Sequence, residues 1–264
     1  MNSNNISEHK ALERAIQLGH YPRYVYKYRP INNFTLYIFQ NSKLFFSNPK
    51  SFNDPFDCQI VTSTDNTPEE IEIFLNQNAP AFSTEMKKSL AVGWFNRPAD
   101  WNSMINETIN GIINNSAICC FAGANDNVLM WSHYTDSHKG ICLKFDILND
   151  LGFFETPIIV KYDKEYPVYN HLSNPSKIFE CLIQTKAECW NYEKELRVIK
   201  PHGPDGLYEF SKEALSEICF GVNTSEKDIQ DIHNLVQANN FKNTKFKKAE
   251  ISKSSFKILI NDFA

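Results

Sequence analysis

The sequence is poor in the features that mark several common functional classes. Its 264 residues include only 9 glycines, and neither G-x-x-x-x-G-K-[S/T] nor G-x-G-x-x-G occurs. Their absence argues against a P-loop nucleotidase and a Rossmann-type dehydrogenase. The seven cysteines form no C-x-x-C pair, so a structural zinc centre is disfavoured and reduced thiols are expected.

Long apolar runs and a strong net charge are missing as well. No stretch of about 18 apolar residues could span a bilayer. The first ten residues lack the charged and apolar regions of a signal peptide. A formal net charge of −4 gives no global sign of nucleic-acid or anionic-membrane binding. We therefore expect a cytoplasmic protein with no membrane partner.

Aromatic residues are abundant, at 13% of the chain, with 20 Phe and 11 Tyr. Together with the order of apolar patterns they predict a single α+β domain with a mixed or antiparallel β core. The core is expected to begin at about residue 24, after an N-terminal helix over residues 5–19. Thr67, Pro68 and Glu70 form a capping box, which opens a helical insertion over about residues 67–115.

The most unusual stretch is W-N-Y-E-K-E-L-R-V-I, at residues 190–199. In an extended strand alternate side chains share a face, so Glu193, Glu195 and Arg197 are expected to project together. Such a set is costly unless its charges pair or meet a ligand. The two acids are therefore candidates for catalysis. The alternative is a polar strand on which glutamate and arginine simply pair.

A second polar and aromatic segment is W-S-H-Y, at residues 131–134, followed by Asp136 and His138. Its rings and histidines suit a pocket that holds a flat ring. The alternative is a tight connection in which Trp131 and Tyr134 only pack in the core.

A third segment is N-D-P-F-D, at residues 53–57. Asn53, Asp54 and Asp57 offer oxygen ligands to a divalent metal, and the same sequence is equally good as a rigid turn.

Several motifs match a known family in order. They are Y-K-Y-R, F-F-S-N-P-K-S-F-N-D-P-F-D, C-F, M-W-S-H-Y-T-D-S-H-K-G-I-C-L-K-F-D and W-N-Y-E-K-E-L-R, which begin at residues 26, 45, 120, 130 and 190. They resemble a bacterial family named only as domain of unknown function 2971. The resemblance covers roughly Tyr24 to the C-terminus and by itself implies no activity.

The order of an early Y-K-Y strand, a polar N-D-P turn and a late E-x-E also looks like that of ADP-ribosyltransferases. Their relatives include toxins that modify DNA or RNA with NAD. This second resemblance implies their fold for the β core and NAD as the substrate. In those enzymes a polar residue of the first strand holds the NAD ribose. An aromatic ring stacks on nicotinamide, and a late glutamate bonds the ribose 2′-hydroxyl.

Carried over to this chain, the resemblance gives Glu195 the late catalytic role and Glu193 the role of orienting the acceptor. Lys27 takes the first-strand position, where many relatives have histidine, and no S-T-S segment is present. Tyr134 or Trp131 would stack on nicotinamide. The other expected cofactor-binding residues are Arg29, which is the alternative to Lys27, and Tyr28, Asn53, Asp54, His133 and Arg197. Lys27, Arg29 or Arg197 would bind the pyrophosphate.

The favoured hypothesis is an NAD-dependent ADP-ribosyltransferase, or an NAD glycohydrolase, acting as a toxin or phage-defence effector. It predicts a nucleic-acid or protein acceptor, an antitoxin or defence-system neighbour, and no bound metal. One alternative is a metal-dependent nuclease effector built from Asn53, Asp54, Asp57, His133 and Glu195 around Mg²⁺. The other is a non-enzymatic nucleotide- or partner-binding module in which the acids are structural.

Overall fold

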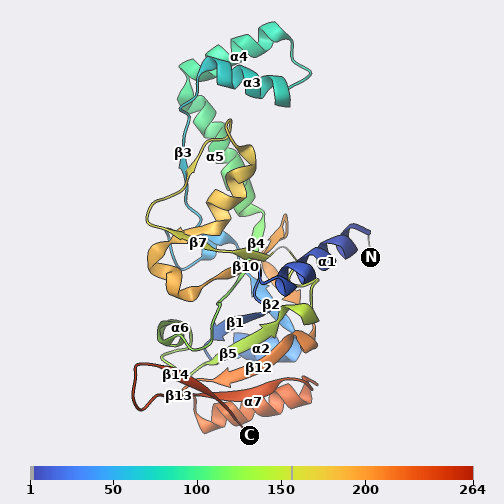
Figure 1. Cartoon of the computed structure of the whole chain (residues 1–264), viewed down its shortest axis with the longest axis vertical. Helices are drawn as coiled ribbons and strands as arrows, with labels where there is room; N and C mark the ends of the chain where they lie inside the picture. The colour runs from blue at the N-terminus through green and yellow to red at the C-terminus, as the bar shows by residue number, and fades with distance from the viewer. Residues whose placement is uncertain (1–2, 156, 264) are drawn as a thin grey trace. The chain divides into compact units, whose positions relative to one another are not determined.

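The computed structural model describes residues 3–155 and 157–263 and confirms a mixed α+β chain. Its elements are drawn in Figure 1. The chain divides into two compact units. The first is formed by residues 1–47, 117–160 and 189–264, and the second by residues 48–116 and 161–188.

A five-stranded sheet in the order β1-β5-β12-β13-β14 forms the base of the first unit. Neighbouring strands are antiparallel except β12 and β13, which are parallel and are joined by helix α7. A parallel pair needs such a crossover because its strands start at the same edge. The elements are β1 (Tyr24–Arg29), β5 (Ile141–Asp146), β12 (Leu215–Phe220), α7 (Glu226–Ala238), β13 (Lys245–Ile251) and β14 (Ile258–Asp262).

Two smaller sheets complete the β structure of this unit. One has the order β4-β10-β6 and the other pairs β11 with β2. Isolated bridges join Tyr26 of β1 to Ala122, just after β4, and Ser47, just after β2, to Ile118 of β4, while β10 is a sheet neighbour of β4. The strands are β2 (Lys43–Phe46), β4 (Ser116–Phe121), β6 (Pro157–Ile159), β10 (Leu196–Pro201) and β11 (Gly206–Glu209).

Helices α2, α6 and α7 of the first unit begin at side-chain caps. Asn32 accepts a hydrogen bond from the Thr35 amide at the start of α2, and Asn127 caps α6 in the same way. Between the sheets and helices lies one large apolar core, which includes Val25, Phe121 and Phe145. The helices are α1 (Ser3–Gln17), α2 (Asn33–Asn41) and α6 (Val128–Tyr134), with 3₁₀ turns at Ile147–Asn149, Glu188–Glu193 and Lys212–Ala214.

The second unit contains the predicted helices. The Thr67–Glu70 capping box is formed, with Thr67 Oγ1 accepting from the Glu70 amide and Glu70 accepting from the Thr67 amide. Helices are α3 (Pro68–Asn78), α4 (Thr84–Asn96) and α5 (Pro98–Asn114). Short parallel pairs join β3 (Val61–Thr62) to β8 (Val168–Tyr169) and β7 (Lys161–Asp163) to β9 (Thr185–Ala187). The remaining turns are 3₁₀ at Pro49–Ser51 and Pro175–Lys177 and a π turn at Glu180–Gln184.

Two local predictions are wrong. The segment expected to be extended from Trp190 is a 3₁₀ helix up to Glu193, Lys194 has φ +47°, and strand β10 begins only at Leu196. Glu193 and Glu195 therefore do not lie on one strand. The apolar pattern of residues 176–188 also predicts a helix, but the structure has 3₁₀ and π turns followed by β9 there.

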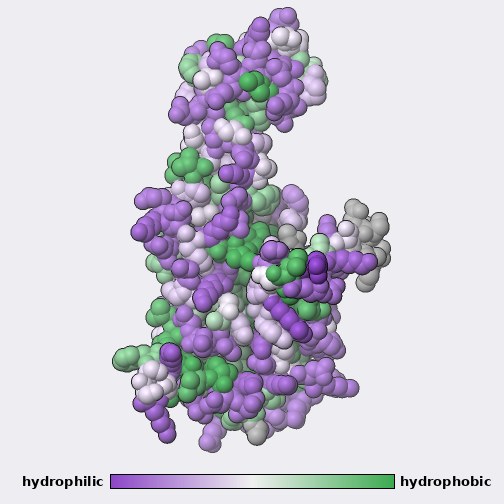
Figure 2. All heavy atoms as spheres, viewed as in Figure 1, coloured by the Kyte–Doolittle hydropathy of each residue, from purple (hydrophilic) through white to green (hydrophobic). Residues whose placement is uncertain are grey.

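Among the described residues no helix is long and apolar enough to cross a membrane. Exposed apolar side chains nevertheless gather at the hairpin between β13 and β14, and hydrophobic side chains are visible there in Figure 2. Phe256 at the hairpin tip is fully exposed, and Ile251 is 70% exposed.

Candidate functional site

Strand β1 carries different chemistry on its two faces, because alternate side chains point to opposite sides. Tyr26 and Tyr28 lie with the cluster that contains Trp131, and we call this side the tyrosine face. Lys27 and Arg29 point to the other side, where they line a pocket beside α2. We call that side the lysine face. The expected NAD-binding residues are thus divided between the two faces.

Glu195 and Arg197 form a buried ion pair. Arg197 Nε lies 2.7 Å from Glu195 Oε1, and a terminal guanidinium nitrogen lies 3.4 Å from Oε2. Glu195 is 2% exposed and Arg197 is 0% exposed. The pair is made although Glu195 precedes β10 and Arg197 lies within it. The pairing of glutamate with arginine, which is expected if residues 190–199 are only structural, is therefore present.

Glu195 also contacts the Cys120 thiol. Burial, followed by the charge of Glu195, raises the pKa of the Cys120 thiol well above its ordinary value, and the two side chains are hydrogen-bonded. Cys120 is consequently a protonated thiol near neutral pH, which donates to the carboxylate. That state is the opposite of the thiolate that a nucleophilic cysteine needs.

Lys27 reaches the same cysteine from β1. Its Nζ donates a 2.9 Å hydrogen bond to the Cys120 carbonyl oxygen and lies 5.3 Å from the centre of the Phe121 ring. Lys27 and Glu195 therefore converge on one residue of β4, although they are far apart in the sequence. Through this shared residue, Lys27 of the first strand and the late glutamate, Glu195, come close to each other.

Glu193 belongs to a second polar group on the tyrosine face. The Tyr134 hydroxyl donates a 2.8 Å hydrogen bond to Glu193 Oε1, and Glu193 is 5% exposed. Tyr134 and Tyr192 both pack against the cluster of Tyr28 and Trp131. Beside them, His133 Nδ1 lies 3.2 Å from the Tyr192 hydroxyl, and His133 is exposed.

The turn that carries both glutamates is held by contacts to the loop after β4. The Gly123 amide donates to the Glu193 carbonyl, and the Asn127 side chain donates to the Tyr192 carbonyl. A Cβ on Gly123 would lie 2.8 Å from Lys194 Cβ, so only glycine allows this approach. These contacts fix the 3₁₀ conformation that periodicity along residues 190–199 did not predict.

Trp131 and Tyr28 form the buried base of the site. Their rings meet edge to face, with centroids 5.2 Å apart and an angle of 87°. Trp131 is 0% exposed and its Nε1 donates to the Asn125 carbonyl, while the Tyr28 hydroxyl donates to the Ala124 carbonyl. Burial raises the pKa of Tyr28 far above its usual value and that of Tyr26 to about 12. Tyr134 is the more accessible of the two rings expected to stack on nicotinamide.

Asn53 and Asp54 lie in the second unit, in the predicted turn. Asp54 Oδ1 accepts from the Phe56 amide, and its buried Oδ2 has no hydrogen-bond partner among the described atoms. Asp57 Oδ1 accepts from the Cys58 amide, and its Oδ2 lies 4.0 Å from Lys186 Nζ. Within residues 3–155 and 157–263, no group of three or more histidine, cysteine, aspartate or glutamate side chains could hold a metal ion.

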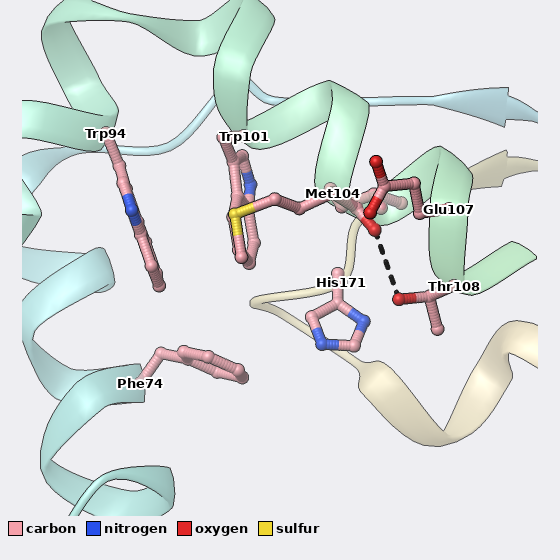
Figure 3. A pocket seen from close by; sticks show the side chains of 8 residues that line it. Phe74, Trp94, Trp101, Met104, Glu107, Thr108 and His171 are labelled. Atoms are coloured by element: carbon pink, nitrogen blue, oxygen red, sulfur yellow. Dashed lines mark hydrogen bonds between the residues drawn. The ribbon is translucent and has the colours of Figure 1, made fainter.

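The second unit also holds a pocket of about 540 Å³ that none of the expected site residues lines (Figure 3). Trp94 and Trp101 stack with ring centroids 4.4 Å apart, and Phe74 and His171 meet Trp101 edge-on. Burial lowers the pKa of His171, which favours its neutral form. Trp101 is a buried residue of α5, and Trp94 lies near the end of α4.

Comparison with protein families gives one match. Residues 130–198 match the model of a family described as Protein of unknown function (DUF2971). The resemblance expected from the motifs is confirmed over this stretch, and it includes Trp131, Tyr134, Glu193, Glu195 and Arg197. No curated protein and no solved structure matches the chain. The DUF2971 segment thus contains the acidic cluster, whereas Lys27 and Arg29 lie outside it.

Proposed function

We propose that this chain is an NAD-cleaving enzyme of the ADP-ribosyltransferase type, with its chemistry at Glu195 and Glu193. The observation that carries the proposal is the convergence of Lys27 and Glu195 on Cys120. A first-strand cation and a late glutamate must approach one another to act on the same nucleotide, because ligand sites are compact.

In this proposal Glu195 stabilises the positive charge that develops on the ribosyl C1′ carbon. The bond from C1′ to the pyridinium nitrogen breaks, and nicotinamide leaves with the bonding electron pair. A carboxylate that is already fixed in place stabilises such charge without having to reorganise. The Arg197 contact at 2.7 Å is what fixes Glu195. Arg197 is therefore a positioning residue.

The acceptor would be handled by Glu193 and the residues around it. Glu193 accepts the acceptor's proton as its oxygen or nitrogen attacks C1′. Tyr134, which donates to Glu193 Oε1, is half-buried and supplies the ring for nicotinamide. The exposed His133 and its partner Tyr192 lie at the outer side of this group and would contact the acceptor.

The phosphates of NAD require cations, and Lys27 is assigned to them because it bonds Cys120, the residue that Glu195 also contacts. Its ammonium group donates to the Cys120 carbonyl and has no carboxylate partner among the described ion pairs. A lysine is a strong partner for phosphate. The residues present thus include a cation, a ring and two carboxylates for the parts of NAD. A nucleic acid, a protein or water would be the acceptor, and a toxin or phage-defence effector is the setting we propose.

The experiment is incubation of the purified chain with NAD labelled in its adenylate phosphate, together with cell lysate. The proposal expects release of nicotinamide and appearance of label on protein, on nucleic acid or in free ADP-ribose. These products identify the acceptor. Label that stays entirely in intact NAD, over a range of pH and enzyme concentrations, would overturn the proposal.

One observation favours a second candidate, a non-enzymatic nucleotide- or partner-binding module. Glu195 and Arg197 are both fully buried and directly paired, as structural ion pairs are. In that case Glu195→Gln lowers the free energy of unfolding, and neither the wild type nor the variant turns over NAD. Growth arrest on expression separates the candidates, because only the enzyme predicts arrest that disappears when Glu195 is replaced under conditions where the variant remains folded.

A further inference from the structure

A cavity with cationic side chains in its lining lies on the lysine face of β1. It has a volume of about 730 Å³ and is enclosed by the end of β1, helix α2, β2 and β11. Sites for small organic ligands usually have volumes of about 300–1,000 Å³. The pocket belongs wholly to the first unit and contains neither Glu193 nor Glu195.

Its charges are all of one sign. Lys27, Arg29 and Lys43 line the pocket, and no carboxylate does. In the described part of the chain none of the three forms an ion pair within 4.0 Å. Glu209 is opposite Lys43 in the pairing of β2 with β11, but it is not part of the lining. Cations gathered without counter-charges create a field that attracts an anion.

Arg29 is the most constrained of these cations. It is partly buried, and its side chain makes one hydrogen bond to a described residue, at 3.4 Å to Thr35 Oγ1. Burial lowers the pKa of Arg29, which reflects the cost of removing its charge from water. A guanidinium has five N–H donors in a planar fork that fits a carboxylate, sulfonate or phosphate. Most of those donors remain for a ligand.

Apolar side chains form the rest of the wall. Phe34 and Tyr37 lie on α2 and are 77% and 37% exposed, while Phe45 on β2 is 51% exposed. Leu207 on β11, at 47% exposed, faces the same pocket. Exposed aromatic rings that are grouped together, and not scattered singly, mark a binding surface. The pocket therefore offers rings beside cations.

We propose that this pocket binds a small organic anion with a flat aromatic body. Its acidic group would meet Arg29 and Lys43, and its rings would lie against Phe34, Tyr37 and Phe45. The one-sided charge of the lining selects an anion, and the exposed rings select an aromatic body. This inference does not depend on NAD cleavage, because Arg29 and Lys43, which would meet the acidic group, take no part in the proposed reaction, although Lys27 also lines the pocket.

The test uses the fluorescent probe 1-anilinonaphthalene-8-sulfonate with the full chain. We expect saturable binding that Arg29→Gln combined with Lys43→Gln weakens at least tenfold. Lys139→Gln, an exposed lysine outside the pocket, is the matched control and should leave the affinity unchanged. The neutral analogue N-phenyl-1-naphthylamine keeps the rings without the sulfonate and should bind at least tenfold more weakly than the probe.

Competition then defines the ligand class. AMP should displace the probe, because it joins an anion to an aromatic ring, whereas adenosine at the same concentration should not. Equal binding of the neutral analogue, or unchanged affinity in the double variant, would overturn the proposal. Displacement by decanoate but not by AMP would overturn the requirement for an aromatic body. Phe34→Ala, at an exposed position, tests how much the aromatic wall contributes to binding of the probe without altering the charge of the pocket.

Discussion

The two faces of β1 differ in how their charges are balanced. Near the tyrosine face Glu193 accepts a hydrogen bond from Tyr134, and at the start of β10 Glu195 and Arg197 are buried together. On the lysine face, Arg29 and Lys43 line an open pocket with no carboxylate. The charges of Glu195 and Arg197 are thus balanced within the protein, whereas the cations of the lysine-face pocket are open to a ligand.

The difference shows what each arrangement is suited to. Buried charges with partners are held rigidly, which is the condition for stabilising charge during a reaction. Cations without partners are costly in the free protein and gain most when an anion arrives. Substitutions on the tyrosine face should therefore affect stability strongly, and those on the lysine face should affect binding.

The largest effect is expected from Glu195→Gln. This change removes a carboxylate that pairs with the fully buried Arg197, and breaking a buried ion pair costs about 3–5 kcal/mol. Urea unfolding measures the loss. Glu250→Gln, at an exposed glutamate of β13, is the control and should change stability by about 0.5 kcal/mol or less. Equal stability of the two variants would show that the Glu195 contact contributes little.

A smaller effect is expected from Trp131→Phe. Removing the indole leaves a cavity beside Tyr28 and leaves the Asn125 carbonyl without its Nε1 donor, for a loss of about 2 kcal/mol. Phe34→Ala on the lysine face changes stability by about 0.5 kcal/mol or less, since Phe34 is 77% exposed. Thermal and urea unfolding measure both variants. If Phe34→Ala lowers the free energy of unfolding as much as Trp131→Phe does, the expected difference between the two faces is wrong.

The next effect is alkaline destabilisation. Burial raises the pKa of Tyr26 from 10.0 to about 12 and that of Cys219 from 9.0 to about 12. Because these folded-state values lie above the unfolded ones, the stabilisation is complete below about pH 9 and is lost as the pH rises towards 12. The melting temperature should be constant from pH 7 to about pH 9 and then fall. Tyr26→Phe should reduce the fall, and an unchanged slope would contradict the assignment.

The smallest effect on stability is expected from Arg29→Met. Methionine keeps the apolar stem and removes a partly buried charge that has no carboxylate partner in the lining, so stability should change by about 1 kcal/mol or less. Binding of the sulfonate probe should nevertheless fall. A stability loss as large as that of Glu195→Gln would mean that Arg29 serves the fold and not a ligand.

Local signals in the sequence predicted much of the fold. The capping box at Thr67 and Glu70 and the aromatic pattern of residues 24–28 correctly indicated α3 and β1. The 3₁₀ conformation of residues 188–193 could not be predicted from periodicity. It depends on Gly123 and Asn127, which bond this segment from a distant loop.

The composition of the site was less predictable than its position. The parity of β1 predicts two faces, yet the NAD assignment placed Lys27, Tyr28 and Arg29 together. Only the packing of Tyr28 on Trp131 and the position of Arg29 beside α2 separate them. The role of Glu195 as the partner of both Arg197 and Cys120 depends on where β4 and β10 pair, which no local pattern reports.

The most direct measurement of the central claim is the rate of nicotinamide release from NAD by the wild-type chain and by two glutamate variants. The wild type and Glu250→Gln should release nicotinamide at equal rates. Glu195→Gln should release it at least about 100-fold more slowly, at a temperature where all three proteins are folded. Tyr134→Phe, which removes the hydroxyl that bonds Glu193, should also slow release. The absence of release by the folded wild-type chain, or equal rates for wild type and Glu195→Gln, would contradict the account.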